Sequence, residues 1–253
     1  MIDGLGADER AVRNLISYSI TFSVIIFSVG LVATAGYGQL NAVSESQQIT
    51  NAERSMVAVT SGFQALDQER AVVQRSELDL SDGSLSVGND STVRVNVTDT
   101  SVNETLTPRS LELDIGDTTF TYTNGALLRD GVGERPAMIE SPPVTCVDGQ
   151  AVVPVVSLNV TDTAAIGGEE VSVTGRTVER ELLFPLNRTG PDSNDATDTV
   201  NVTVSSDRSA AWNRYFERNG NWTAAPDEPD TYSCSNVGAV FVRRTVVEVS
   251  FQT

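Results

Sequence analysis

A long uncharged stretch dominates the N-terminal part of the chain. No charged residue lies between Arg13 and Glu45, and residues 15–38 are rich in apolar side chains. As an α-helix this stretch reaches roughly 36 Å, which is enough to cross the hydrocarbon core of a bilayer. Arg10 and Arg13 precede it, and the next basic residue is Arg54. This asymmetry predicts that the first residues lie inside the cell and the remainder outside.

A buried core helix and a cleavable secretory signal are the alternative explanations of this stretch. It is longer than the apolar region of a typical signal, and it has no clear small-x-small cleavage site followed by a polar start. Gly30, Thr34 and Gly38 recur at a four-residue spacing, which is typical of helices that pack closely in membranes. We therefore favour a membrane or filament helix.

The helical pattern continues beyond the uncharged stretch. Positions three and four residues apart form the a/d seam of a packed helix. These positions are Ile49, Ala52, Met56, Val59, Phe63, Leu66, Arg70 and Val73. The spacing predicts that the helix extends to about residue 75, with Gly62 and residues 36–38 as the places where it would bend.

After residue 75, short runs of alternating apolar and polar residues are separated by Asp, Gly, Asn and Pro. They predict strands at residues 93–97, 111–115, 120–122, 152–158, 171–178, 200–204 and 240–251. Residues 206–219 instead predict one short helix, capped by Ser or Asp and ended by Gly220. The predicted fold class is α+β, with a long N-terminal hydrophobic α-helix followed by an antiparallel β-sandwich-like domain that carries one short helix.

The charge composition excludes several functions. The chain has 34 acidic and 17 basic residues, all of the latter Arg, and no His, which gives a net charge of −17. Histidine catalysis, histidine metal ligands, lysine Schiff bases and a P-loop lysine are therefore excluded. The negative charge also argues against a nucleic-acid partner. The absence of Lys favours a protein that stays soluble in concentrated salt over an ordinary acidic soluble protein.

Paired carboxylates are the candidates that we consider for catalysis or cation binding. Glu169 with Glu170, or the acidic stretch 192–198, has the residue types of a glycosidase pair, and the stretch also has hard oxygen ligands. A solvated acidic surface explains both more simply, and the stretch lacks the glycine and terminal Glu of an EF-hand. We predict no catalytic residue, no metal site, no cofactor and no enzyme activity.

Two features of the predicted outer part concern covalent modification. Seven Asn-x-Ser/Thr sequons predict N-glycosylation at Asn89, Asn96, Asn103, Asn159, Asn187, Asn201 and Asn221. Chance in a chain rich in Asn, Ser and Thr is the alternative explanation. Cys146 and Cys234 are the only cysteines, and a disulfide between them is favoured over two buried thiols in an oxidising exterior.

Residues 8–16 read DERAVRNLI and lead directly into the apolar helix. This N-terminal segment resembles the class III signal peptides of archaeal type IV pilins. The resemblance implies that a prepilin peptidase cuts between Ala11 and Val12, leaving the helix on the mature subunit. Arg13, Asn14 and the acidic leader depart from the usual pattern of these peptides.

Five further segments carry a second resemblance, at residues 51–54, 124–129, 152–158, 210–217 and 242–251. Through them, the whole chain resembles a haloarchaeal type IV pilin-like family of uncharacterised secreted proteins. The resemblance implies a leader at residues 1–11, a transmembrane or filament-core helix and stalk at 12–75, and an extracellular β domain at 76–253.

The resulting functional expectation is a pilin-like cell-surface structural protein, with a minor or adhesive role in a type IV pilus-like filament. Its expected partners are other pilin-like subunits through the N-terminal helix, the membrane and prepilin peptidase. The expected location is the cell membrane with the bulk of the chain extracellular, or a cell-surface filament. The alternative is a single-pass, membrane-anchored surface glycoprotein that does not polymerise.

Overall fold

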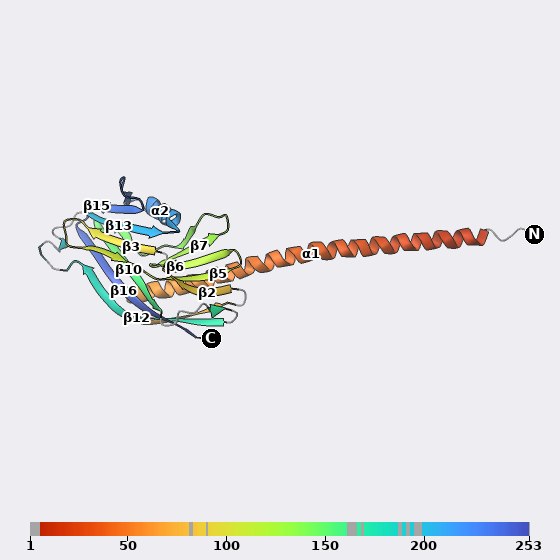
Figure 1. The fold of residues 1–253 in the computed structure, drawn as a ribbon, viewed down its shortest axis with the longest axis horizontal. Coiled ribbons are helices and arrows are strands. Elements are labelled where there is room, and N and C mark those ends of the chain that lie inside the picture. The colour runs from red at the N-terminus through yellow and green to blue at the C-terminus, as the bar shows by residue number, and fades with distance from the viewer. Residues whose placement is uncertain are drawn as a thin grey trace, which may run out of the picture. The chain divides into compact units, whose positions relative to one another are not determined.

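The computed structural model describes residues 6–80, 83–89, 91–160, 166–167, 170–186, 189–190, 193–194 and 199–252, except for the side chains of residues 6–16, 33–44 and 166–167. The chain forms two compact units, Met1–Gln47 and Gln48–Thr253. The helix α1 (Gly6–Asp67) occupies the first unit and continues into the second. The second unit holds three β-sheets and the short helix α2 (Figure 1).

The first sheet has the strand order β1-β12-β16-β10-β9. Its strands are β1 (Val73–Asp79), β12 (Glu170–Phe184), β16 (Ala239–Gln252), β10 (Gln150–Val160) and β9 (Thr145–Val147). The central strand β16 pairs antiparallel with β12 on one side and parallel with β10 on the other. The three longest strands therefore lie side by side.

The second sheet has the strand order β11-β2-β5-β6-β7-β8. Its strands are β11 (Ile166–Gly167), β2 (Gly83–Gly88), β5 (Ser110–Ile115), β6 (Thr118–Thr123), β7 (Ala126–Gly131) and β8 (Ala137–Glu140). Strands β5 to β8 follow one another as an antiparallel meander. Asn124 and Gly125, with φ of 47° and 79°, close the two-residue turn between β6 and β7, which is the turn that an Asn-Gly pair favours.

The third sheet has the strand order β14-β15-β13-β3-β4. Its strands are β14 (Thr223–Ala224), β15 (Thr231–Ser235), β13 (Thr199–Ser206), β3 (Ser91–Val97) and β4 (Asn103–Leu106). The helix α2 (Ser209–Arg218) follows β13 and contacts β13, β14 and β8. Figure 1 shows α2 beside β13.

Two hydrophobic cores share the first sheet. One lies against α1 and the second sheet and includes Met56 and Phe63. The other lies against α2 and the third sheet and includes Trp212 and Phe216. Strand β16 contributes its first half to the second of these cores, and its second half to the first. Strand β10 is divided in the same way, which explains its near-continuous apolar sequence.

The predicted fold class is wrong. The chain is mostly β rather than α+β, and the described residues form three sheets with one parallel pairing rather than an antiparallel β-sandwich-like domain. Alternation along a strand identifies its buried face but not its partner, so it could not reveal the parallel pair.

The helix α1 is long, at 62 residues, but the expectation that it is a hydrophobic, membrane-spanning helix is wrong. Residues such as Ser19, Thr21 and Ser23 interrupt the apolar residues of α1. Within the residues described, no helix combines the length and the hydropathy that a membrane span needs.

The ends of both helices differ from the predictions. α1 ends at Asp67 rather than near residue 75, because the chain turns at Glu69, which has a φ of 60°. α2 begins after Arg208, which makes no side-chain cap, and its C-cap is Asn219 rather than Gly220. In contrast, the seven predicted strands are confirmed as β3, β5, β6, β10, β12, β13 and β16.

Candidate functional site

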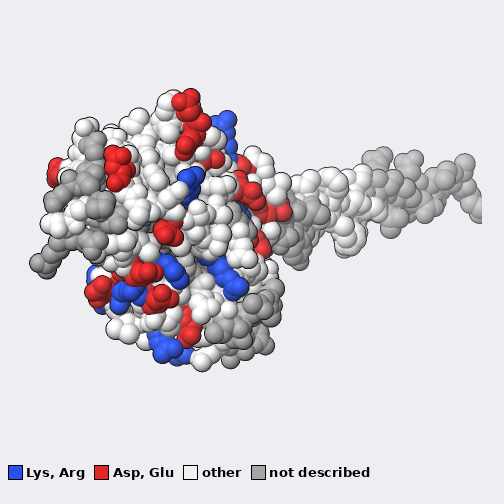
Figure 2. All heavy atoms as spheres, turned by 60° about the vertical axis from the view of Figure 1, so that its left-hand side comes forward, with Lys and Arg blue, Asp and Glu red and all other residues white. Residues whose placement is uncertain are grey.

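The described stretch of α1 in the first unit carries exposed apolar side chains on all sides. Their exposed fractions lie between 55% and 76%. They belong to Tyr18, Ile20, Phe22, Val24, Ile25, Ile26, Phe27, Val29, Leu31 and Val32. Figure 2 shows the described stretch that holds these residues in white, without blue or red atoms. So many exposed apolar side chains on one helix are normally covered by a partner, so this surface is the first candidate site.

Three hydroxyl groups in this stretch are bonded within the helix. Thr21 Oγ1 donates to the carbonyl of Ser17 at 2.9 Å, and Ser23 Oγ to that of Ser19 at 2.8 Å. Ser28 Oγ donates to the carbonyl of Val24 at 2.7 Å. Each hydroxyl proton therefore has an acceptor one turn earlier, so these residues can enter an apolar environment without losing a hydrogen bond.

The same helix surface has a hollow whose lining residues follow the helical repeat. It is lined by Ser19, Ile20, Ser23, Val24 and Phe27, with a volume of about 400 Å³. Ile20, Ser23, Val24 and Phe27 stand at positions i, i+3, i+4 and i+7. Four residues at this spacing form the hole that receives one side chain of a neighbouring helix in knobs-into-holes packing.

Polar contacts hold the end of α1 in the second unit. Gln64 Nε2 donates to the carbonyls of Gly125 at 2.9 Å and Ser141 at 3.0 Å. Arg180 Nη2 donates to the carbonyl of Leu66 at 2.6 Å, which satisfies a carbonyl in the last turn. The helix end is thus bonded to the β6–β7 turn, to the residue after β8 and to β12.

A buried ion pair completes this attachment. Asp67 is fully buried, and Oδ2 accepts a hydrogen bond from Arg243 Nη2 at 2.7 Å. Its other oxygen accepts a bond from Thr245 Oγ1 at 2.7 Å. The pKa of Tyr122 is raised, mainly because the side chain is buried and secondly because of the negative charge of Asp67. The buried carboxylate therefore fixes α1 to the central strand β16.

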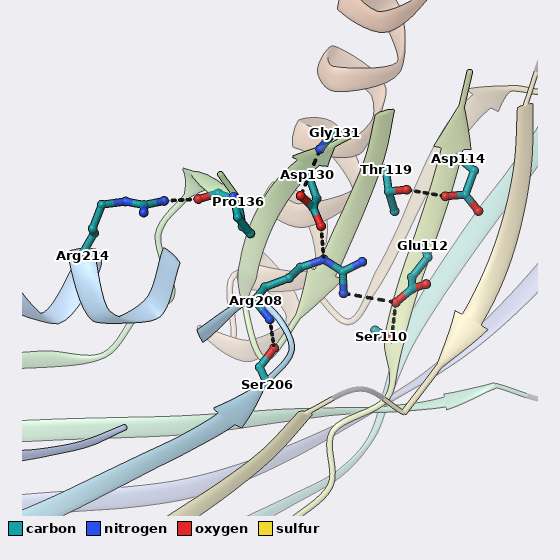
Figure 3. A network of polar contacts seen from close by, with 10 residues as sticks. All are labelled: Ser110, Glu112, Asp114, Thr119, Asp130, Gly131, Pro136, Ser206, Arg208 and Arg214. Atoms are coloured by element: carbon teal, nitrogen blue, oxygen red, sulfur yellow. Dashed lines mark hydrogen bonds and ion pairs between the residues drawn. The ribbon is translucent and has the colours of Figure 1, made fainter. Parts of the chain in front are cut away.

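A second candidate site is a pocket of about 470 Å³ between α2 and β8. It is lined by Met138, Ser141, Arg214, Tyr215, Arg218 and Asn219, together with two alanines. Burial raises the pKa of Tyr215, so its hydroxyl stays protonated and donates to the carbonyl of Val144 at 2.9 Å. Arg214 Nη2 donates to the carbonyl of Pro136 across the start of β8 (Figure 3).

Aromatic packing and charge fix α2 beside this pocket. Phe216 stacks on Tyr232 at a centroid distance of 4.2 Å and meets Trp222 edge-on at 5.4 Å. Before the helix, the Arg208 guanidinium lies 3.8 Å from a Glu112 oxygen and 4.0 Å from an Asp130 oxygen. Figure 3 shows Arg208 between these carboxylates, which come from β5 and β7. The start of α2 is thereby joined to the second sheet.

The two cysteines that the sequence paired are bonded in the structure. Cys146 on β9 and Cys234 on β15 form a disulfide with a Cα–Cα distance of 6.1 Å. The bond links the first and third sheets. The sequence favoured this bond because both cysteines fall in the predicted outer part of the chain, and it did not indicate which sheets the bond joins.

The predicted glycosylation sites differ in accessibility. Asn89, Asn103, Asn159 and Asn221 are exposed, Asn96 and Asn201 are half-buried, and Asn187 lies outside the described residues. Asn221 Nδ2 donates to the carbonyl of Cys146 at 2.5 Å, and Asn201 Nδ2 to Asn96 Oδ1 at 3.5 Å. A glycan at either nitrogen would replace one of its two hydrogens beside a bond that the nitrogen already donates. Glycosylation therefore remains a prediction, and the structure favours the other exposed sites.

The remaining predicted residues give less information. The backbone of Ala11 and Val12 lies in α1, but their side chains are outside the described set. Asp192, Asp195 and Asp198 also lie outside it, as does Glu169. Among the residues that the structure does describe, no group of His, Cys, Asp or Glu has the arrangement of a metal site.

The residues of the α2 pocket were not identified from the sequence. Arg214 and Arg218 stand four positions apart in a short helix whose aromatic residues were noted for packing alone. That spacing places both on one helix face and was a usable signal. The contribution of Met138 and Ser141 depends on the strand pairing of β7 with β8, which no local pattern revealed.

Comparisons with known proteins place almost the whole chain in one family. No curated protein matches it, and no solved structure does. The model of the family of unknown function DUF7289 matches residues 10–252. The chain therefore belongs to the family DUF7289.

Proposed function

We propose that the protein is a pilin-like structural subunit that assembles with further copies of itself through α1. The observation that supports this most strongly is the all-round exposed apolar surface of α1 between Tyr18 and Val32. Burying one Val, Ile or Phe side chain is worth about 1.5–3 kcal/mol. Eight such exposed side chains on one helix, together with Tyr18 and Leu31, provide a strong driving force for association.

The occupant that fits this surface is α1 of another copy. The hollow at Ile20, Ser23, Val24 and Phe27 has the spacing of a hole for a helical side chain. The same helix supplies Ile25, Ile26 and Val29, which are of suitable size to enter it. The β domain would then lie outside a core of packed helices.

A matched pair of double variants tests this assembly. In V24Q/F27Q, two amides enter the helix hollow, and burying them against a neighbouring helix without partners would be costly. In the control V72Q/V132Q, two exposed apolar side chains of the second unit are also replaced by Gln. Sedimentation velocity and electron microscopy of the full chain measure assembly, while thermal unfolding reports whether the β domain is intact.

We expect the original chain and the control to form filaments or oligomers, and V24Q/F27Q to sediment as a monomer with unchanged unfolding. Equal assembly of both variants would refute packing through this hollow. A monomer that binds vesicles but never self-associates would instead support the non-polymerising surface glycoprotein.

Processing by a prepilin peptidase is a separate part of the proposal. N-terminal sequencing and the intact mass of the protein from the cell surface would measure it. A start at Val12 is expected, whereas a chain that keeps residues 1–11 would contradict pilin-type processing.

A further inference from the structure

The pocket between α2 and β8 is locally positive on a strongly acidic protein. The chain has twice as many acidic as basic residues, yet two arginines and no carboxylate line the pocket. In the described part of the chain, neither Arg214 nor Arg218 forms an ion pair with a carboxylate. This contrasts with Arg176, Arg208, Arg243 and Arg244, which all have acidic partners. The positive charge of the pocket is therefore available to an anionic ligand.

The two arginines are suited to one acid group. They stand at i and i+4 of α2, so their side chains leave the same helix face about 5–6 Å apart. Arg214 is held across the pocket by its bond to the carbonyl of Pro136. A guanidinium has five N–H donors, so this bond orients the group and leaves other donors for a ligand. Such a planar fork matches a carboxylate.

The rest of the lining suits a small polyhydroxylated ring. The Met138 side chain and the Tyr215 ring provide apolar surface, and Asn219 and Ser141 add polar atoms. Asn219 Nδ2 donates to the Tyr215 hydroxyl at 3.3 Å, which directs that amide and leaves its carbonyl oxygen as an acceptor. A volume of about 470 Å³ lies in the usual range for small-molecule sites.

We propose that this pocket binds a sugar acid, a hexuronate whose carboxylate is held by Arg214 and Arg218. The ring lies against Met138 and Tyr215, and its hydroxyls bond to Asn219 and Ser141. No covalent step is involved. The proposal is independent of assembly through α1, because all of these residues belong to the second unit.

Isothermal titration calorimetry of the full chain tests the ligand class. Glucuronate is the probe, glucose is the neutral control and inorganic phosphate is the alternative anion. The full chain is kept in solution with a polyoxyethylene detergent, because a detergent with a sugar headgroup would compete with glucuronate for the pocket. We expect glucuronate to bind at least about tenfold more tightly than glucose or phosphate.

The variants R218Q and R218K test the role of Arg218 in binding, and R94Q is the control. Arg218 is exposed, so R218Q should leave thermal unfolding unchanged. It should weaken glucuronate binding by about tenfold or more, with R218K intermediate because it keeps the charge but loses the planar fork. Arg94 on β3 is also exposed and bonds to Asn103, and R94Q should bind normally.

Three results would overturn the proposal. They are the absence of glucuronate binding, whether or not phosphate binds, equally tight binding of glucose, and R218Q binding glucuronate as tightly as the original chain. None of these outcomes depends on whether the chain forms filaments.

Discussion

At the scale of single residues, Gly175 shows how closely α1 approaches the first sheet. A Cβ at this position would lie 2.6 Å from Phe63 Cε1 and 3.2 Å from Leu66 Cδ1. Real side chains do not approach so closely, so any larger residue must displace two buried groups of α1. The close approach at Gly175 therefore contributes to the attachment of α1 to the first sheet, as the polar contacts do.

This geometry predicts opposite effects for two alanine substitutions. G175A should lower the free energy of unfolding by about 1–3 kcal/mol through overpacking. The control G62A lies in α1 itself, where the added Cβ would meet Gln74 at 3.4 Å, an ordinary contact. It should raise stability by about 0.5–1 kcal/mol through helix propensity. Denaturant unfolding measures both, and a neutral G175A would show that Phe63 can move away.

The sequence predicted which residues of α1 are buried, but not which residues of the β domain contact them. Ala52, Met56, Val59, Phe63 and Leu66 follow the predicted seam and are all buried. The seam failed at Arg70 and Val73 because α1 has ended by then and both residues are exposed. Periodicity reports the buried face of a helix, but the polar contacts that end the helix come from Arg180 and Arg243, more than a hundred positions away.

At the scale of elements, the disulfide between β9 and β15 joins two sheets that share one core. It encloses a chain segment with a sequence separation of 88. A cross-link over a segment of this length restricts the unfolded chain and is worth about 4 kcal/mol.

Removal of this bond should therefore destabilise the β domain. The variant C146A/C234A should lose about 4 kcal/mol of unfolding free energy, measured by urea denaturation. Addition of reductant should destabilise the original chain to a similar extent and leave the variant unaffected. A variant as stable as the oxidised chain would contradict this prediction.

The sequence predicted seven of the sixteen strands that the structure describes, but not how they pair. Each predicted strand from 93–97 to 240–251 lies in an observed strand, since alternation and turn residues are local signals. The pairing of β10 with β16 joins Gln150 to Ala239 in parallel. Such distant contacts depend on the tertiary fold, which explains the wrong sandwich-like architecture.

At the scale of the whole molecule, the net charge of −17 determines how stability responds to salt. Repulsion among the acidic side chains disfavours the compact state. The Debye length falls from about 10 Å at 0.1 M salt to about 3 Å at 1 M, so salt removes most of this repulsion. Acidic and basic groups are interspersed on the face shown in Figure 2, so local attractions offset only part of it.

The thermal midpoint should therefore rise with potassium chloride, on the order of 5 °C between these concentrations. The variant D227N/E228Q removes two exposed charges and should reduce the rise. Sucrose, which does not screen charge, serves as the control. A midpoint that falls with added salt would contradict this electrostatic explanation.

The central position of β16 affects the order in which the molecule can mature during synthesis. This strand separates β12 from β10, contributes to both cores and supplies Arg243 and Thr245 to the end of α1. All of these contacts join residues far apart in sequence, and such contacts form slowly. A ribosome must have passed Gln252 before the first sheet can close. Chains arrested earlier would leave both cores open to proteases and chaperones, so folding of the β domain is coupled to the completion of β16.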